Sequence, residues 1–163
     1  MQAEFTGQEI RWQWCMLDDL TAAQLHAVFA AREAVFVVEQ SCAYQELDDW
    51  DLDAEHLIAW HGQRIAAYLR VLAPSVRFAE PSIGRILTST QHRGSGLGRE
   101  LLRRGLAHVD AKYPRRDVRI SAQVYLERFY RSFGFVTATE PYAEDGIPHI
   151  EMLRTAAREA QPG

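Results

Sequence analysis

The sequence predicts a mixed α/β fold in which one central sheet is flanked by helices. Segments that alternate apolar and polar residues, as strands do, exchange along the chain with segments that repeat apolar residues at helical spacing. Glycine or proline residues stand at most of the junctions between them. The predicted order is strand, helix, three strands, helix, strand, helix and two strands, which fits one layered α/β unit.

The length and uniform composition indicate one domain. A chain of 163 residues is long enough to bury a core without disulfides, and it contains no internal repeat, linker or low-complexity segment. We therefore expect a single domain over residues 1–163, with a folded core over about 10–154 and a frayed tail over 155–163.

The first third of the chain changes its pattern twice. Residues 9–17 alternate apolar and polar side chains, which predicts a strand. Residues 20–40 repeat apolar side chains at helical spacing, and Thr21 with Gln24 matches a capping box at the start of a helix. Residues 41–53 then form an aromatic and strongly acidic loop.

The middle of the chain predicts three strands in succession. Residues 56–61 and 64–73 are joined by a Gly-Gln pair, as in a tight hairpin. A loop bracketed by prolines, 74–81, ends them, and a third strand is predicted over 82–89.

The last third alternates again. An amphipathic helix is predicted over residues 96–112, followed by a strand over 117–124 and a short helix over 126–133. The final strands are predicted over 135–139 and 147–154.

The composition argues against several classes of protein. A formal net charge of −4 disfavours a nucleic-acid partner, which favours a basic surface. No apolar run approaches the roughly 20 residues that span a bilayer, and the first residues lack the pattern of a signal peptide. Cys15 and Cys42 have no metal-site spacing and make no disulfide framework. We expect a cytoplasmic protein that binds no nucleic acid, no membrane and no metal.

A glycine-rich stretch, QHRGSGLG over residues 91–98, lies between a predicted strand and a predicted helix. The first turn of a helix has free backbone N–H groups and a positive dipole end, and glycines let a ligand approach them closely. Arg93 can add a charge-assisted contact. The stretch therefore predicts a phosphate or pyrophosphate site, with a plain glycine-rich turn as the alternative.

Two common nucleotide motifs do not fit these glycines. A nucleoside-triphosphate loop needs a glycine five residues after the first one and then a lysine, but the chain has Arg99 and Glu100 there. A dinucleotide fingerprint needs a third glycine at a position where this chain has Arg99 or Leu101.

These motifs resemble a known family. Residues 91–96, the helix that follows them and the segment 129–135, FYRSFGF, are similar to the GNAT family of N-acetyltransferases. Residues 31–57 and 145–152 are similar to its ElaA-like branch, and the resemblance extends over about residues 10–154. It implies a mostly antiparallel sheet with splayed central strands.

The resemblance also implies an activity. For this chain it implies the transfer of an acetyl group from acetyl-coenzyme A (acetyl-CoA) to a primary amine, by direct attack in a ternary complex and without a metal. A homodimer is also an expectation from the family. The alternative is a GNAT fold that binds acyl-CoA without catalysis, as a sensor or an assembly module.

The resemblance places the cofactor pyrophosphate on the backbone amides of the glycine stretch and the pantetheine arm along the preceding strand end. The implied cofactor contacts are Leu87, Thr88, Ser89, Gln91, Arg93, Gly94, Ser95, Gly96, Leu97, Gly98 and Tyr130.

Two residues are candidates for proton transfer. The resemblance places Tyr130 at the usual general-acid position of the family, and a phenol with a reference pKa of about 10 is suited to protonating a thiolate. Its alternative role is packing beside Phe129 and Phe133. His149 is the candidate base, because an imidazole titrates near neutral pH. A structural histidine, or a water relay in place of a base, is the alternative.

The acidic stretch over residues 44–56 contains six carboxylates. It lacks the glycine of an EF-hand, which argues against calcium. A solvated loop is one interpretation. The other is that Glu46 and Asp48, with Tyr44, bind the acceptor amine, which predicts a cationic small molecule or a peptide amine.

Overall fold

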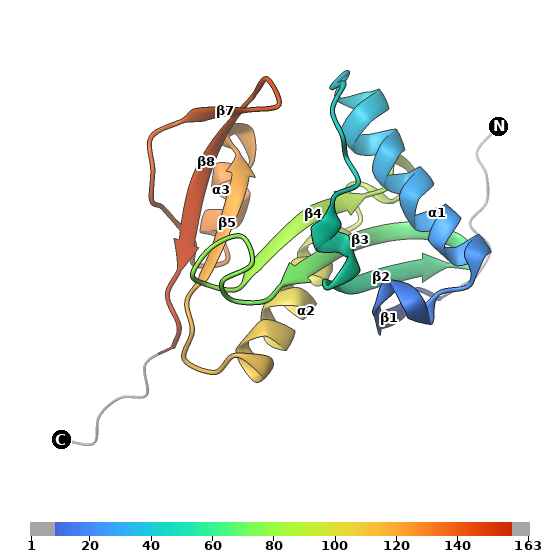
Figure 1. Ribbon diagram of the computed structural model, residues 1–163, viewed down its shortest axis with the longest axis horizontal. Helices are drawn as coiled ribbons and strands as arrows, with labels where there is room; N and C mark the ends of the chain where they lie inside the picture. Colours follow the sequence, from blue (N-terminus) through green and yellow to red (C-terminus); the bar gives the residue numbers. More distant parts are fainter. Residues whose placement is uncertain (1–8, 158–163) are drawn as a thin grey trace.

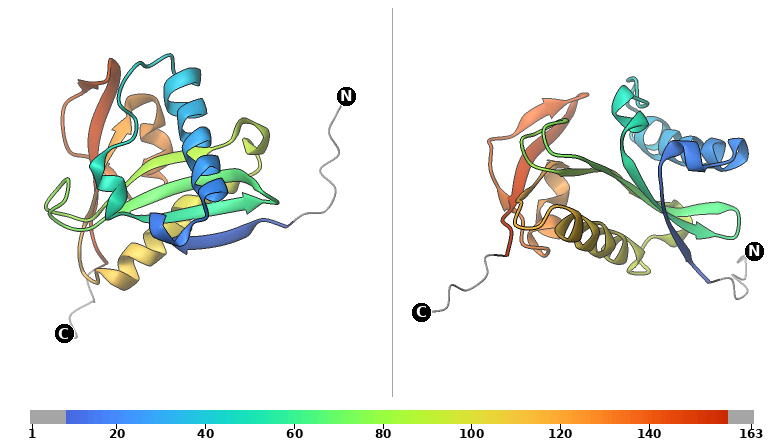
Figure 2. Two further views of the ribbon diagram at one scale, coloured as in Figure 1. Left: turned by 45° about the vertical axis from the view of Figure 1, so that its right-hand side comes forward. Right: turned by 60° about the horizontal axis from the view of Figure 1, so that its bottom comes forward.

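The structure is a computed structural model that describes residues 9–157. The expectation of no signal peptide concerns mostly residues 1–8, and most of the expected tail is 158–163; both lie outside the described residues. The described residues contain an eight-stranded sheet with helices on both of its faces (Figure 1 and Figure 2). The predicted α/β class is therefore confirmed.

The sheet has the strand order β1-β2-β3-β4-β5-β8-β6, and β7 pairs with β8 off this path. The strand pairs are antiparallel except for β4 with β5, so the expected, mostly antiparallel arrangement is confirmed. The strands are β1 (Arg11–Cys15), β2 (Glu55–His61), β3 (Arg64–Leu72), β4 (Ser82–Thr88), β5 (Val118–Gln123), β6 (Val136–Thr137), β7 (Tyr142–Glu144) and β8 (Ile147–Arg154).

Helix α1 covers one face of the sheet, and α2 and α3 cover the other (Figure 2). The helices are α1 (Ala22–Glu33), which continues as the π-helix η2 (Ala34–Glu39), α2 (Leu97–Lys112) and α3 (Glu127–Arg131). Short 3₁₀ turns are η1 (Leu17–Asp19), η3 (Asp49–Leu52), η4 (Thr90–His92) and η5 (Val124–Leu126). Because successive strand residues face opposite sides, Tyr68 packs in the cluster under α1, and its neighbour Leu69 packs in the cluster under α2.

One strand of the structure, β7, is absent from the sequence-based prediction. It forms a hairpin with β8 around Asp145 and Gly146, whose φ angles are 50° and 76°. Positive φ at both central residues is typical of the Asp-Gly hairpin turn, so the sequence does contain a local signal for this hairpin. A strand of three residues is too short to show an alternating pattern.

The central strands β4 and β5 splay apart, as the family resemblance implies. Among the described residues they pair at one position, Ser82 with Arg119. Further along, Leu69 of β3 stands opposite two residues of β4, Arg85 and Ile86, and Arg85 has a φ of 52°. Such a bulge bends a strand, so β4 diverges from β5 as it approaches the glycine stretch.

The predicted capping box at the start of α1 is confirmed. The Thr21 hydroxyl accepts a hydrogen bond from the backbone N–H of Gln24 at 3.2 Å, and the Gln24 side chain accepts one from the N–H of Thr21 at 2.9 Å. We expect Thr21→Ala to lower the free energy of unfolding by about 1 kcal/mol in urea titrations, because one helix N–H loses its acceptor. Thr21→Ser keeps the acceptor and is the control; equal losses in both variants would contradict this role.

Candidate functional site

Two cavities lie along the divergence of β4 and β5. One, of about 670 Å³, is lined by the glycine stretch, the end of β4 and the end of η2, and we call it the loop cavity. The other, of about 390 Å³, is lined by the β7–β8 hairpin, the segment after η2 and the bulge of β4, and we call it the hairpin cavity. Six residues line both cavities: Phe36, Gln40, Ile86, Gln123, Leu126 and Tyr130. The cavities therefore meet at these residues.

The glycine stretch turns from β4 into α2 along the wall of the loop cavity. Gly94 and Gly96 have φ angles of 76° and 83°, in the left-handed region that glycine enters without strain. Gly96 is the N-cap of α2, so the backbone N–H groups of the next residues have no acceptor within the helix. These amides and the positive end of the helix dipole make this wall suitable for an anion.

Gly98 lets α2 begin close against the end of β4. A Cβ atom at this position would lie 3.2 Å from Oγ1 of Thr88, which is tighter than ordinary van der Waals contact. A larger residue would therefore push the start of the helix away from the strand end.

Arg93 links the glycine stretch to the end of η2. Its guanidinium donates to the two carboxylate oxygens of Glu39 at 2.6 and 2.9 Å, and to the backbone oxygen of Thr88 at 3.1 Å. The hydrogen bond from Arg93 lowers the pKa of Glu39 below its usual value.

The structure brings most of the predicted cofactor contacts to the loop cavity. Those that line it are Leu87, Thr88, Arg93, Gly94, Gly96, Gly98 and Tyr130. Three others line a neighbouring hollow: Gln91, Ser95 and Leu97. The hydroxyl of Ser89 lies 2.6 Å from Nδ1 of His92. The loop cavity therefore brings together the strand end, the helix start and the tyrosine, while these four residues do not line it.

Tyr130 lies on α3 at the junction of the two cavities and lines both of them. Its ring packs edge-to-face against Phe129 and Phe135. Burial raises the pKa of the phenol above its ordinary value, so the hydroxyl stays protonated at neutral pH. Tyr130 therefore packs against other aromatic rings and also lies at the junction of the two cavities.

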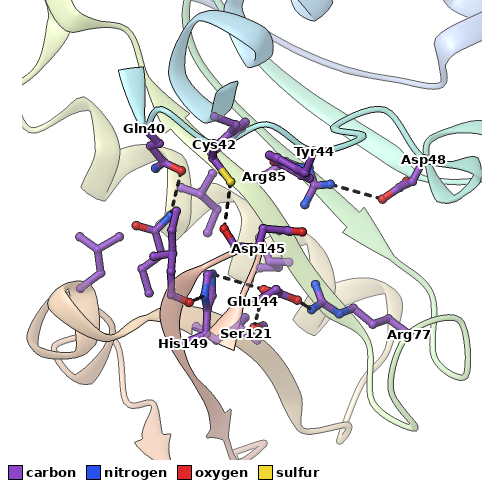
Figure 3. A pocket seen from close by; sticks show the side chains of 18 of the residues that line it. Gln40, Cys42, Tyr44, Asp48, Arg77, Arg85, Ser121, Glu144, Asp145 and His149 are labelled. Atoms are coloured by element: carbon purple, nitrogen blue, oxygen red, sulfur yellow. Dashed lines mark hydrogen bonds and ion pairs between the residues drawn. The ribbon is translucent and has the colours of Figure 1, made fainter. Parts of the chain in front are cut away.

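His149 lines the hairpin cavity and stands opposite Gln123 in the β5–β8 pairing. Directly opposed residues of an antiparallel pair share one face of the sheet, so His149 lies beside a residue of the cavity junction. Its Nδ1 is 2.7 Å from the backbone oxygen of Ile147, and its Nε2 is 3.3 Å from Oε2 of Glu144. Figure 3 shows His149, Glu144 and Ser121 gathered on one side of this cavity.

The acidic loop is only partly solvated, because three of its carboxylates bind arginines from other segments. We call this group the ion-pair cluster; its members are Arg32, Arg70, Arg85, Glu46, Asp48 and Asp51. Arg32 is fully buried and donates to Glu46 at 2.9 Å and to the two oxygens of Asp51 at 2.7 and 3.0 Å. The cluster contains three positive and three negative groups, so its formal charges cancel.

The arginines also control ionisation in this cluster. Burial alone would raise the pKa of Asp51, but the hydrogen bonds and charges of Arg32 and Arg70 outweigh it and leave the pKa below its usual value. His56 lies beside the cluster, with Nδ1 at 2.5 Å from the Tyr68 hydroxyl and Nε2 at 3.0 Å from the backbone oxygen of Asp51. Burial lowers the pKa of His56. These contacts make His56 a hydrogen-bonded core residue, as the strand pattern around it indicates.

The three predicted acceptor contacts lie in different places. Tyr44 and Asp48 line the hairpin cavity. The Glu46 side chain is buried and accepts hydrogen bonds from Arg32 and Arg85, at 2.9 and 2.8 Å. Glu46 therefore binds the arginines of the ion-pair cluster and does not line the hairpin cavity.

Several polar residues of the hairpin cavity are not evident from the sequence. They are Gln40, Arg77, Arg85, Ser121, Gln123 and Glu144. They come from five separate segments, so no local spacing connects them. The one local signal is the Asp-Gly turn after Glu144, since a hairpin there brings Glu144 beside the strand that carries His149.

The splayed sheet, the glycine stretch at a helix start and the joined cavities are those of an acyltransferase of the GNAT type. The acetyltransferase (GNAT) domain model matches residues 5–156, and the chain belongs to this family. It is an enzyme of the N-acetyltransferase class, which uses acyl-CoA as co-substrate and an amine as acceptor.

Relatives place the chain in the ElaA-like branch. Protein ElaA of Escherichia coli (strain K12) is 41% identical over 147 residues, which cover 89% of this chain and 96% of ElaA. The crystal structure of E. coli ElaA has a TM-score of 0.83 and 40% identity, and covers 90% of this chain and 99% of its own. The crystal structure of an acyl-CoA N-acyltransferase from Pseudomonas aeruginosa has a TM-score of 0.85 and 42% identity, with 90% and 100% covered. The resemblance to ElaA-like proteins is thereby confirmed.

Over residues 9–157, no helix has the length and apolarity to cross a membrane. In the same range no group of three or more His, Cys, Asp or Glu is placed to hold a metal ion.

Proposed function

We propose that this chain transfers the acetyl group of acetyl-CoA to a primary amine by direct attack in a ternary complex, and that residues 1–163 act as one catalytic domain. The observation that carries the proposal is the meeting of the loop cavity and the hairpin cavity at Tyr130 and Gln123. A thioester held in the first cavity and an amine held in the second come together at that junction. Holding both reactants there converts a bimolecular step into a nearly unimolecular one.

The donor side fits coenzyme A in two ways. The glycine stretch offers the backbone amides of residues 93–98 and a helix start to the pyrophosphate. The end of β4 and the residue after it, 87–89, have diverged from β5, and we propose that backbone groups there pair with the amides of the pantetheine arm. The Thr88 oxygen, which accepts from Arg93, and the Ser89 N–H, which donates to the oxygen of Ala66, already have partners. One N–H of this edge polarises the thioester carbonyl.

Four of the proposed cofactor residues act from the outer side of the loop. The hydroxyl of Ser95 donates to the backbone oxygen of His92 at 2.6 Å, and Ser89 contacts the ring of the same histidine. Gln91 and Leu97 border the same hollow. We propose that these residues hold the shape of the loop and contribute backbone groups to the cofactor.

The acceptor side is the hairpin cavity, whose volume of about 390 Å³ suits a small amine or one side chain or terminus of a peptide. We propose that Tyr44 and Asp48 contact the acceptor, while Glu46 acts from behind by holding Arg32 and Arg85. Asp48 already accepts hydrogen bonds from Arg70 at 2.6 and 2.8 Å. A cationic acceptor therefore shares this carboxylate with an arginine.

Two protons have to move during the reaction. His149 takes a proton from the acceptor ammonium, directly or through a water molecule, which frees the lone pair of the amine. Tyr130 donates its hydroxyl proton to the thiolate sulfur when the thioester C–S bond breaks. Its protonated state at neutral pH supports this role.

A non-catalytic acyl-CoA-binding module is the alternative function. A protonated tyrosine and a histidine beside the cavity junction favour the enzyme. A panel of amines, from polyamines to amino acids and peptides, tested with a thiol-release assay decides between them. Turnover with any amine supports the enzyme, whereas acetyl-CoA binding without turnover on the whole panel would favour the module.

Cofactor binding is tested by Gly96→Glu. A Cβ at Gly96 meets no atom within 4 Å, so a side chain has space, but it places a carboxylate beside the proposed pyrophosphate. Two negative groups placed side by side repel each other, at a cost of several kcal/mol. We therefore expect the dissociation constant for acetyl-CoA, measured by calorimetry, to rise by about a hundredfold.

Gly96→Ala is the matched control for this variant. It adds the strain of a left-handed residue without the charge, and should weaken binding much less than Gly96→Glu. If both variants bind acetyl-CoA equally well, the pyrophosphate does not lie at this loop.

A further inference from the structure

We propose that Glu144, on strand β7, is a positioning residue that stabilises the proton that His149 receives from the acceptor. This inference rests on the proposed function, since it assigns a partner to the proposed base. It adds a carboxylate from a strand that lies outside the motifs of the sequence.

The hydrogen bonds of His149 determine which nitrogen carries its proton. Nδ1 lies 2.7 Å from the backbone oxygen of Ile147, and a carbonyl oxygen only accepts hydrogen bonds. Nδ1 is therefore the protonated nitrogen of the neutral ring, and Nε2 carries the lone pair. The contact with Ile147 therefore leaves Nε2 as the nitrogen through which His149 can act as a base.

The group nearest to Nε2 is a carboxylate, which cannot donate a hydrogen bond to the lone pair of Nε2. Oε2 of Glu144 lies 3.3 Å away, so a lone pair and a carboxylate face each other while His149 is neutral. A proton on Nε2 turns this opposition into an ion pair with the carboxylate at 3.3 Å. The pair is therefore arranged to receive one proton and to hold it.

Glu144 is itself held in place on both oxygens. Arg77, from the loop between β3 and β4, donates to Oε1 at 2.5 Å, and the hydroxyl of Ser121 on β5 donates to Oε2 at 3.1 Å. The Tyr142 hydroxyl lies 2.5 Å from Ser121, and its ring stacks on His149. Figure 3 shows Arg77, Ser121 and His149 around the same carboxylate.

Charged and titratable groups lie near His149 on two of the neighbouring segments. Strand β7 contributes Glu144 and Tyr142, and the loop before β4 contributes Arg77 through Glu144. Strand β5 contributes two neutral residues, Ser121 and Gln123. Glu144 is therefore the negative group in direct contact with the ring.

The proton balance closes with these groups. The acceptor ammonium loses one proton to Nε2 of His149, and the imidazolium then donates from Nδ1 to Ile147 and forms an ion pair with Glu144. The amine forms its bond to the acetyl carbon, the C–S bond breaks, and Tyr130 protonates the sulfur. The second proton of the amine returns to the Tyr130 oxygen, and His149 releases its proton to water.

Glu144→Gln tests this role, because it keeps the size of the side chain and removes the charge. We expect kcat to fall about tenfold at neutral pH, because the imidazolium loses its ion-pair partner, while the KM for acetyl-CoA stays unchanged. Glu144→Asp keeps the charge and should recover part of the rate.

Glu80→Gln is the matched control. Glu80 is also a partly buried carboxylate that binds an arginine: both of its oxygens accept hydrogen bonds from Arg119 at 3.1 Å, but it lines neither cavity. This variant should keep the wild-type rate. An unchanged rate in Glu144→Gln would overturn the proposal, as would a loss of acetyl-CoA affinity parallel to the loss of rate.

A second measurement needs no acceptor. In the free protein, nitrogen-15 spectra of labelled histidine should show the Nδ1–H tautomer of His149, and the Nε2 signal should change in Glu144→Gln but not in Glu80→Gln. An unchanged Nε2 signal would refute the contact with Glu144 even if the enzyme is active. Conversely, if no amine supports thiol release in the wild type, the proposed function fails while this measurement still decides the contact.

Discussion

Replacing Arg32 by methionine is expected to lower the free energy of unfolding by about 3–5 kcal/mol. Arg32 is fully buried and is the shared partner of Glu46 and Asp51, which are also buried. Methionine fills much of the same volume but leaves both carboxylates short of a positive partner. The expected loss comes from these uncompensated charges and not from the loss of an attractive pair as such.

Urea unfolding of the two proteins measures this loss, and Arg131→Met is the control. Arg131 pairs with Glu127 on the surface of α3 with more than half of its side chain exposed, so its removal should change stability by less than about 1 kcal/mol. If the two variants lost the same free energy of unfolding, burial of the ion-pair cluster would not determine how much the cluster contributes to stability.

The pH dependence gives a second signature. The arginines hold the pKa of Asp51 below its usual value, so their contribution is present above about pH 4 and is lost as the pH falls through the lowered pKa. The stability difference between wild type and Arg32→Met should therefore be full at pH 7 and shrink on acidification below about pH 4. A difference that is independent of pH would contradict this account.

The ion-pair cluster also marks a boundary of what the sequence predicts. Local rules detect partners three or four residues apart on a helix, whereas Arg32 is 14 residues from Glu46 and 19 from Asp51. An isolated stretch rich in aspartate therefore has the composition of a solvated loop. Its burial depends on α1 and β3 bringing arginines to it, which only the tertiary fold specifies.

The donor side of the site could be predicted because its parts, unlike those of the ion-pair cluster, are close together in the sequence. A strand, a glycine stretch and a helix are consecutive in the chain, so their pattern alone indicates an anion site between residues 89 and 98. The spacing of residues in the sequence does not predict which side of the loop a side chain faces, as Gln91 and Ser95 show. The structure places both on the hollow next to the loop cavity.

The acceptor side depends on strand register. His149 lies beside the junction residue Gln123 because the two residues pair, and Glu144 lies beside His149 because β7 folds back on β8. A shift of one residue in either pairing would turn these side chains to the other face of the sheet. Sequence periodicity does not fix such a register, so Glu144 emerges only from the structure.

Tyr130→Phe is expected to lower kcat by about a thousandfold, the middle of the range for a positioned general acid. The phenyl ring keeps the edge-to-face packing on Phe129 and Phe135, so the fold and the loop cavity should be preserved. The affinity for acetyl-CoA, measured by calorimetry, should therefore change little. What the variant loses is the hydroxyl proton at the junction of the two cavities.

The pH profile separates this role from simple packing. Burial raises the pKa of Tyr130, so the wild-type enzyme keeps its proton donor beyond the pH at which an exposed tyrosine ionises, and no alkaline loss of rate from this group is expected below about pH 10. In Tyr130→Phe the thiolate has to leave unprotonated, so substrates with better thiol leaving groups should recover part of the rate. Tyr113→Phe, at the end of α2 and outside both cavities, should behave as wild type. Full turnover of Tyr130→Phe at every pH would exclude the hydroxyl as the acid and leave Tyr130 as a packing residue, with the proton then supplied by water.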